Sequence, residues 1–211
     1  MGLFFEYLFS NPAMYLSWVT VIVFSICVHE YAHAITALRL GDDTAARAGH
    51  LTLNPLVQMG PVSLVVLLLV GIAWGSVPIR PEALRGRRDG AWVAFAGPLS
   101  NLALAAISVL LATALASWAP TAEAAIGVLL LAARANMVLF LFNMLPIPML
   151  DGWKVYAAWI PGMGRIPDEH LGNVSWMLIL VVWMTPAFTM IWRGADTAVF
   201  TAMAFLGQIF G

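Results

Sequence analysis

The feature that most constrains the fold is an apolar run from Met14 to Leu40 that contains His-Glu-Tyr-Ala-His at residues 29–33. The run is longer than the roughly 20 residues that a helix needs to cross a bilayer. Residues four apart share a helix face, so His29 and His33 can bind one metal ion together. Glu30 lies about 100° around the helix from His29, where it can take a proton from water at the metal. The sequence therefore predicts a hydrolytic zinc site inside a membrane helix.

The composition is that of an integral membrane protein. Of the 211 residues, 62% are hydrophobic and 10% are charged, whereas about 25% of a soluble domain is charged. The net charge of −1 gives no indication of nucleic-acid binding. The first ten residues lack a basic n-region and a cleavage site, so we expect no removable signal peptide. We predict a single membrane domain over residues 1–211, with a catalytic core at about 14–160 and C-terminal helices over 171–211.

The other apolar segments predict an all-α polytopic membrane protein with about five to six transmembrane or re-entrant helices. Beyond 14–40, these segments are 61–77, 89–118, 124–145, 171–192 and a tail, 195–210, that we expect to lie along the membrane interface.

Segment 61–77 is short enough to be either a span or a re-entrant hairpin. Arg39 and Arg47 precede it, and a cluster of arginines at 80–88 follows it. A hairpin would place all of these arginines on one side of the membrane, and a crossing would separate them. We favour the hairpin, with the arginines on the cytoplasmic side.

A period-two alternation over residues 48–54 predicts a short membrane-associated β element near residues 44–54. Its residues Leu51, Thr52 and Leu53 could offer an open edge to which an extended substrate segment pairs.

A catalytic zinc usually has three protein ligands and a water, so His29 and His33 need a partner. Asp42 and Asp43 would be about 14 Å beyond His33 if the helix continued, which is too far. His50 and His170 lie in polar, turn-rich surroundings typical of solvated surface residues.

Asp151 is the favoured third ligand. It follows an apolar span in which Pro146 and Pro148 break the helix. A carboxylate at membrane depth costs several kcal/mol unless it is paired or bound to a metal. Irregular backbone at that depth is tolerated where it lines a cavity enclosed by protein.

Polar residues also occur within the other apolar spans. Asn101 and Asn143 could form interhelical hydrogen bonds, or they could contact the substrate backbone or stabilise the transition state. Arg134 and Asn136 fall in the middle of segment 124–145, and Arg134 could neutralise a buried acid or extend to the interface.

The motifs, in their order, resemble those of the site-2 protease family of intramembrane zinc metalloproteases. The matching stretches are His-Glu-Tyr-Ala-His at 29–33, Gly-Asp-Asp-Thr-Ala at 41–45, Gly-His-Leu-Thr-Leu-Asn-Pro at 49–55, Ala-Gly-Pro-Leu-Ser-Asn at 96–101 and Asn-Met-Leu-Pro-Ile-Pro-Met-Leu-Asp-Gly at 143–152. The chain departs from the family pattern at Gln58-Met59-Gly60-Pro61, where relatives commonly read His-x-Asp-Pro, and at Trp153, where a second glycine is frequent.

The resemblance implies one zinc ion on His29, His33 and Asp151, with Glu30 as the base and an active site that opens toward the cytoplasm. It favours Asn143 as a substrate contact, and it implies a compact form without a PDZ or CBS domain.

We therefore expect a zinc-dependent endopeptidase that cuts within or near a transmembrane segment of a membrane protein or a signal-peptide remnant, in a prokaryotic cytoplasmic membrane. One alternative is a zinc carrier, which would have no use for Glu30. The other is an inactive relative that binds helices, against which the complete set of site residues argues. The sequence does not determine the oligomeric state.

Overall fold

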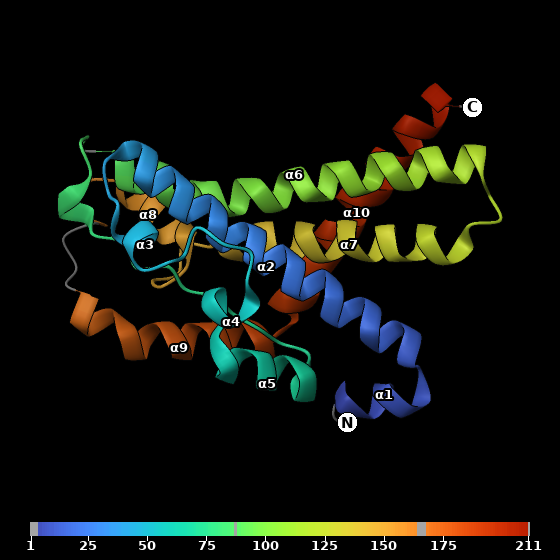
Figure 1. The fold of residues 1–211 in the computed structure, drawn as a ribbon, viewed down its shortest axis with the longest axis horizontal. Helices are drawn as coiled ribbons and strands as arrows, with labels where there is room; N and C mark the ends of the chain where they lie inside the picture. The colour runs from blue at the N-terminus through green and yellow to red at the C-terminus, as the bar shows by residue number, and fades with distance from the viewer. Residues whose placement is uncertain (1–3, 87, 164–167, 211) are drawn as a thin grey trace.

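The computed structural model describes residues 4–86, 88–163 and 168–210, without the side chains of 168–174 and 210. The long helices are α2 (Pro12–Leu40), α6 (Asp89–Trp118), α7 (Glu123–Asn143), α9 (Asp168–Met184) and α10 (Pro186–Phe210). The shorter ones are α1 (Tyr7–Ser10), α3 (Thr44–Arg47), α4 (Pro55–Gln58), α5 (Gly60–Val70) and α8 (Asp151–Ala157), with 3₁₀ turns at Phe4–Glu6 and Pro81–Ala83. Figure 1 shows α2, α6 and α7 packed along one another.

The described part of the chain has three helices that are long and apolar enough to cross a membrane, namely α2, α6 and α7. The pair formed by α9 and α10 is bent by 71° and could supply a fourth, broken span. The described residues thus offer three or four candidate spans and one shorter apolar helix, α5, and the expected five to six transmembrane or re-entrant helices are not confirmed. Helix α5 has 11 residues, and a helix needs about 17 to cross.

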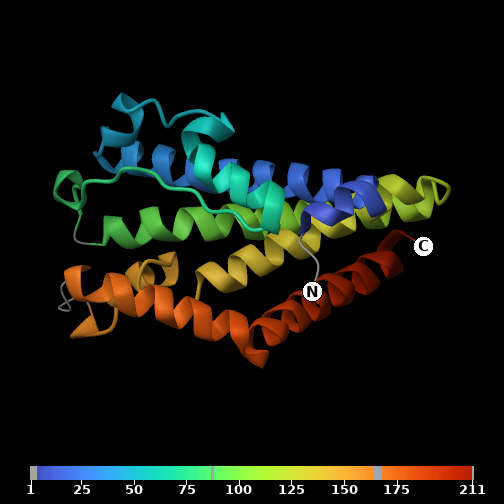
Figure 2. The same ribbon diagram turned by 90° about the horizontal axis from the view of Figure 1, so that it is seen from below.

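The expected span 171–192 is divided because Pro186 begins a new helix. The expected interfacial tail is instead part of α10, which packs against α6 and α7 (Figure 2). Val199 of α10 joins a buried cluster with Val109 of α6 and Ala133 of α7.

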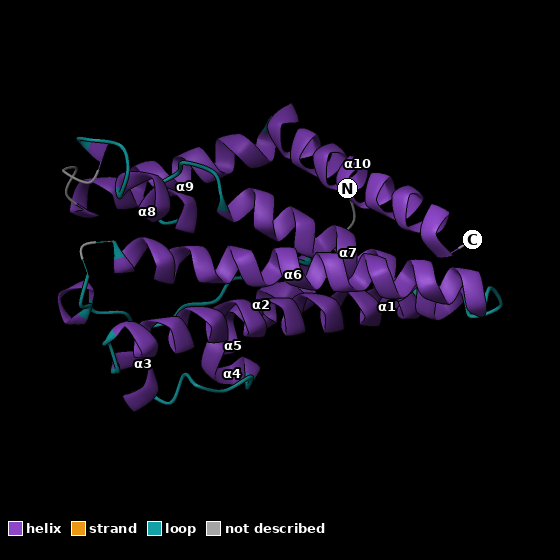
Figure 3. Cartoon of the chain, turned by 90° about the horizontal axis from the view of Figure 1, so that it is seen from above, coloured by secondary structure: helices purple, strands orange, loops and turns teal. Residues whose placement is uncertain are grey.

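The helices form layers around the α2–α6–α7 unit. Figure 3 shows α3, α4 and α5 on one side of this unit and α8, α9 and α10 on the other. Fully buried alanines line the contacts between the long helices, for example Ala34, Ala105 and Ala133. Small side chains let helix backbones approach closely, which favours packing in a membrane where apolar burial gives little gain.

The chain from Gly41 to Arg85 leaves the end of α2 and returns to it. Gly41 closes α2 in the left-handed region, at φ 111°. The Arg85 N–H donates to the Leu40 carbonyl at 3.1 Å, and the Arg80 N–H donates to the Asp42 carboxylate at 2.6 Å. This is the arrangement that the hairpin hypothesis requires, because both ends of the segment and their arginines lie at the same end of α2.

Asp42 holds the returning end of this segment against α2. It is fully buried, and it also accepts a hydrogen bond of 2.9 Å from the Thr44 N–H. Burial by itself would raise the pKa of the Asp42 carboxyl, but the hydrogen bonds from Thr44 and from the Arg80 backbone lower that pKa below its ordinary value.

The predicted β element near residues 44–54 is wrong: the structure describes this whole stretch and has no strand in it. Residues Thr44–Arg47 form α3 instead. The buried Gln58 amide then donates to the carbonyls of His50 and Thr52 at 2.9 and 2.6 Å, which curls the chain around one side chain. Leu51, Thr52 and Leu53 therefore do not form an edge strand.

An extended stretch occurs later, at residues 74–80, which we call the covering segment. Its even-numbered residues are exposed and its odd-numbered residues are half-buried. Ser63 holds its start by donating to the Trp74 carbonyl at 2.6 Å and accepting from the Trp74 N–H at 2.9 Å. The Ser76 N–H donates to the Gln58 carbonyl at 3.1 Å. Hydrogen bonds thus hold the start and the middle of the covering segment, although the structure describes no strand that pairs with it.

The hairpin makes a topological prediction. In a Cys27→Ala background, Ala48→Cys and Ala83→Cys should react with a membrane-impermeant maleimide from the same side of sealed vesicles. Thr121→Cys, in the turn between α6 and α7, should react only from the opposite side. Labelling of Ala48→Cys and Ala83→Cys from opposite sides would contradict the hairpin.

Candidate metal centre

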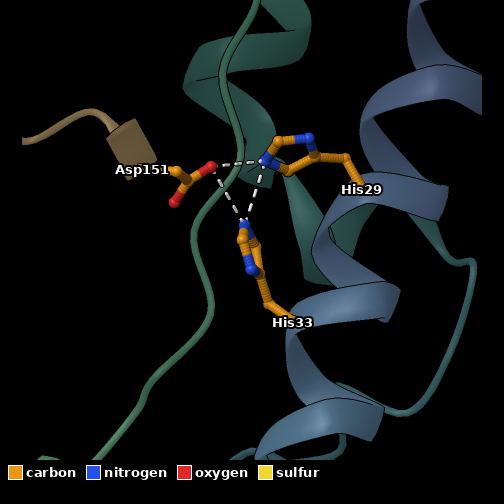
Figure 4. Close-up of side chains that lie close together, drawn as sticks. All are labelled: His29, His33 and Asp151. Carbon is orange, nitrogen blue, oxygen red and sulfur yellow. Dashed lines mark hydrogen bonds and ion pairs between the residues drawn. The ribbon is translucent and has the colours of Figure 1, made fainter. Parts of the chain in front are cut away.

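Three side chains from distant parts of the sequence meet at one point (Figure 4). His29 and His33 come from α2, and Asp151 is the first residue of α8. Asp151 Oδ2 lies 3.0 Å from His29 Nε2 and 3.3 Å from His33 Nε2, and the two Nε2 atoms are 3.0 Å apart. Ligand atoms around a tetrahedral zinc ion are separated by about 3.3 Å. The three atoms therefore have the spacing of a zinc site.

A tight turn brings Asp151 to the histidines. Helix α7 ends at Asn143, and the chain doubles back with Met149 in the left-handed region, at φ 74°. Gly152 packs against the start of this turn, since a Cβ there would lie 2.5 Å from the Met144 carbonyl carbon and 2.6 Å from the Leu145 carbonyl oxygen. Only glycine fits at residue 152. The turn therefore requires the glycine that follows Asp151.

Hydrogen bonds on the far side of each ring set the histidine tautomers. His33 Nδ1 lies 2.7 Å from the Val93 carbonyl oxygen. A carbonyl can only accept, so Nδ1 carries the proton and Nε2 presents a lone pair. His29 Nδ1 lies 2.6 Å from the side-chain oxygen of Asn101 and is set in the same way.

Two imidazole lone pairs and a carboxylate oxygen therefore converge in a buried place. Converging lone pairs repel one another unless a cation lies between them, and two histidines with one carboxylate suit zinc. The donor set fits the expected metal ion.

Glu30 lies beside this group, and it is buried with 7% of its surface exposed. The covering segment passes directly over it: a Cβ on Gly75 would lie 2.5 Å from the Glu30 Cγ and 2.7 Å from its carboxylate carbon. Gly97 of α6 is equally close to the metal ligands, since a Cβ there would lie 2.5 Å from His29 Nε2. Two glycines thus leave the space that Glu30 and the two histidines occupy.

The other candidate residues lie in different surroundings. Asn101 is fully buried behind His29, which makes it a partner of a ligand. Asn143 donates to the Leu139 carbonyl of its own helix at 3.0 Å. His50 contacts Gln58, away from the three ligands. The side chain of His170 lies outside the described residues.

Arg134 has a partner that sequence reasoning missed. Its guanidinium makes two hydrogen bonds to Asp196 of α10, at 2.6 and 3.1 Å, and it lies over the ring of Trp192. The partner was missed because α10 was expected at the interface and not against α7.

Gly75, Gly97 and the Val93 carbonyl were also missed as parts of the site. A glycine within an apolar helix was the available signal for Gly97, because glycine in a helix interior usually has a packing reason. Nothing in the sequence marks Val93, whose role belongs to its backbone.

Comparison with curated proteins finds several named as candidate zinc metalloproteases. The chain is 34% identical over 175 residues to YwhC of Bacillus subtilis, a match that covers 80% of each protein. It is 38% identical over 173 residues to Rip2 of Mycobacterium tuberculosis, covering 77% of this chain and 64% of the relative. It is 32% identical to MJ0611 of Methanocaldococcus jannaschii, covering 74% of this chain and 75% of the relative. No family model and no solved structure matches the chain.

Gly97 provides a test of the metal centre. Gly97→Ala should weaken zinc binding by at least about 100-fold, because the added methyl group occupies the place of the ligand atoms. Gly127→Ala is the matched control: it lies in α7 with nothing within 4 Å of the added Cβ, and it should bind zinc as the unchanged protein does. Zinc bound per protein is measured in detergent against a competing chelator. Equal binding by both variants would contradict the site geometry.

Proposed function

Because this chain belongs to the site-2 protease family of zinc metalloproteases, we propose that it is an intramembrane endopeptidase that hydrolyses a peptide bond within or near a transmembrane segment. The observation that carries the proposal is the position of the site. His29, Glu30 and His33 lie on α2, which is apolar enough to cross a membrane, and all three are buried. A hydrolytic metal site within such a helix suits a substrate that is itself in the membrane.

His29, His33 and Asp151 would hold a zinc ion, which supplies a Lewis acid that acidifies water and polarises the scissile carbonyl. Glu30 would take the proton from the attacking water as its oxygen bonds to the carbonyl carbon. As the C–N bond breaks, Glu30 would return that proton to the leaving amine. One water is consumed and Glu30 ends in its starting form.

Burial strengthens these interactions. Glu30 and the two histidines are each exposed by 7% or less. Charges interact more strongly in such surroundings than in water, so a cation held by the three side chains would stabilise more strongly the negative charge that develops on the attacked carbonyl oxygen.

A transmembrane helix hides its peptide bonds in its own hydrogen bonds, so the substrate must be extended before it can be cut. The edge expected at Leu51–Leu53 does not form. The covering segment is already extended and passes over Glu30, so we propose that the substrate backbone pairs with it by β-augmentation. Asn143, at the end of α7, remains the proposed side-chain contact to the substrate.

The arginines favour a cytoplasmic location for this end of the molecule. Arg80 and Arg85 lie where the hairpin returns to the end of α2, and Arg39 is in the last turn of that helix. We propose an inner-membrane protein of a prokaryote whose active site opens toward the cytoplasm.

The direct test compares Glu30→Gln and Asp151→Asn with the unchanged protein in detergent, by bound zinc and by cleavage of a transmembrane peptide. Glu30→Gln should keep its zinc and lose about 10²- to 10⁴-fold in cleavage rate, the usual contribution of a general base. Asp151→Asn should lose zinc as well, since an amide is a poor ligand for it. Glu123→Gln, an exposed carboxylate at the start of α7, is the control.

Two outcomes would contradict the proposal. If the folded, unchanged protein binds no zinc, the proposed metal site is refuted. If the protein binds zinc and Glu30→Gln leaves cleavage intact, Glu30 is not the general base.

The covering segment gives a separate prediction. Gly75→Ala should leave zinc binding intact but lower cleavage by at least about 10-fold, because the methyl group displaces the Glu30 side chain from its position. Ser76→Ala, on the exposed face of the same segment, should have little effect. Peptide cleavage and bound zinc are measured on both variants, and normal cleavage by Gly75→Ala would show that the segment does not hold Glu30.

A further inference from the structure

A chain of buried polar side chains runs from the metal centre into the helix core. The side-chain oxygen of Asn101 lies 2.6 Å from His29 Nδ1. The Asn101 amide nitrogen donates to the Asn136 side-chain oxygen at 2.9 Å. The Asn136 amide nitrogen donates to Ser25 Oγ and to the Ala132 carbonyl, both at 2.9 Å. Ser25, Asn101 and Asn136 are each exposed by 2% or less.

The direction of every hydrogen bond in this chain follows from its far end. The Ala132 carbonyl can only accept, so it faces the amide nitrogen of Asn136. The Asn136 oxygen must then face Asn101 and can only accept from its amide nitrogen. That leaves the Asn101 oxygen facing His29, where it can only accept from Nδ1–H.

Nδ1 of His29 therefore carries a proton. Nε2, which lies 3.0 Å from Asp151 Oδ2, is left as the nitrogen that would bind the metal. His33 reaches the same state through one hydrogen bond to a backbone carbonyl. His29 reaches it through two side chains that end at a backbone carbonyl of another helix. Reversing either amide would put an NH₂ group against His29 and favour the other tautomer.

We propose that Asn101 and Asn136 are positioning residues that hold His29 in its metal-binding tautomer and orientation. This inference rests on the proposed metal site at His29, His33 and Asp151. The series of hydrogen bonds starts at His29 on α2, crosses to α6 through Asn101 and to α7 through Asn136, and returns to α2 at Ser25. It therefore links the metal site to the packing of these three helices. Asn101 is thus assigned to the metal ligand and not to the substrate.

Hydrogen bonds behind a metal-bound histidine are often as important as the ligands, and their loss typically weakens metal binding by about 10- to 100-fold. Asn101→Leu should fall in this range because it leaves Nδ1 without an acceptor. Asn136→Leu should also fall in it, although Asn136 does not touch His29, because the Asn101 amide is then no longer fixed. Ser25→Ala should have little effect, since the Ala132 carbonyl alone still orients Asn136.

The experiment measures zinc affinity by chelator competition for the full chain in detergent, and the cobalt absorption spectrum of each variant. Thr113→Val is the matched control: it removes a buried hydroxyl from α6, about 18 Å along the helix from Asn101. The second readout is the ¹H–¹⁵N signal of His29 Nδ1–H in histidine-labelled, zinc-loaded protein. An imidazole that binds zinc through Nε2 carries its proton on Nδ1, and a hydrogen bond to Asn101 slows the exchange of that proton with water. A purely structural role would not change that exchange rate.

The expected result is a slowly exchanging Nδ1–H of His29 in the unchanged protein and faster exchange in Asn136→Leu, with weaker zinc binding and an altered cobalt spectrum. Rapid exchange of this proton in the zinc-loaded, unchanged protein overturns the proposal, and this outcome does not depend on whether any variant folds. Unchanged zinc affinity in a folded Asn136→Leu overturns it as well. Failure of the unchanged protein to bind zinc would instead refute the proposed function, which keeps the two failures distinct.

Discussion

The rest of the structure depends on the convergence of His29 Nε2, His33 Nε2 and Asp151 Oδ2 within a buried part of a helix bundle. Such a group of lone pairs is unfavourable in apolar surroundings unless a cation balances it. Each element around the site contributes to holding it. Helix α2 carries His29 and His33, and the turn before Gly152 places Asp151 beside them. Helix α6 has no side chain at Gly97, which leaves room for the two histidines.

The hairpin after α2 shows how a helix that is apolar enough to cross a membrane can carry polar side chains covered by backbone. Asp42 and Leu40 hold its returning end, while Ser63 and Gln58 hold its middle in an extended form. The covering segment lies on Glu30 through Gly75, so backbone covers the Glu30 side chain. A backbone edge is also the group that an unwound substrate segment can recognise without regard to its side chains.

Polar residues inside the bundle fall into two kinds. Asn101 and Asn136 are fully hydrogen-bonded within one chain that reaches a ligand. Arg134 and Asp196 instead form an ion pair that joins α7 to α10, and α10 is bent away from α9 at Pro186. A paired charge between helices is tolerated in a membrane where a lone one would cost several kcal/mol. The ion pair thus fixes the C-terminal helix to the core without contributing to the metal centre.

The sequence by itself predicted the membrane class, the long helices at 14–40, 89–118 and 124–145, and the three residues His29, His33 and Asp151 that the structure brings together. Hydrophobic length and helical spacing are local properties, so they can be read from the order of residues. Only the tertiary structure decided the rest. Residues 44–54 curl around Gln58 instead of forming a strand, α10 packs on α7, Gly75 and Gly97 lie against Glu30 and the histidines, and Asn136 is linked to His29 through Asn101. These depend on which distant groups satisfy a backbone carbonyl or leave a space, and no local pattern in the sequence records such contacts.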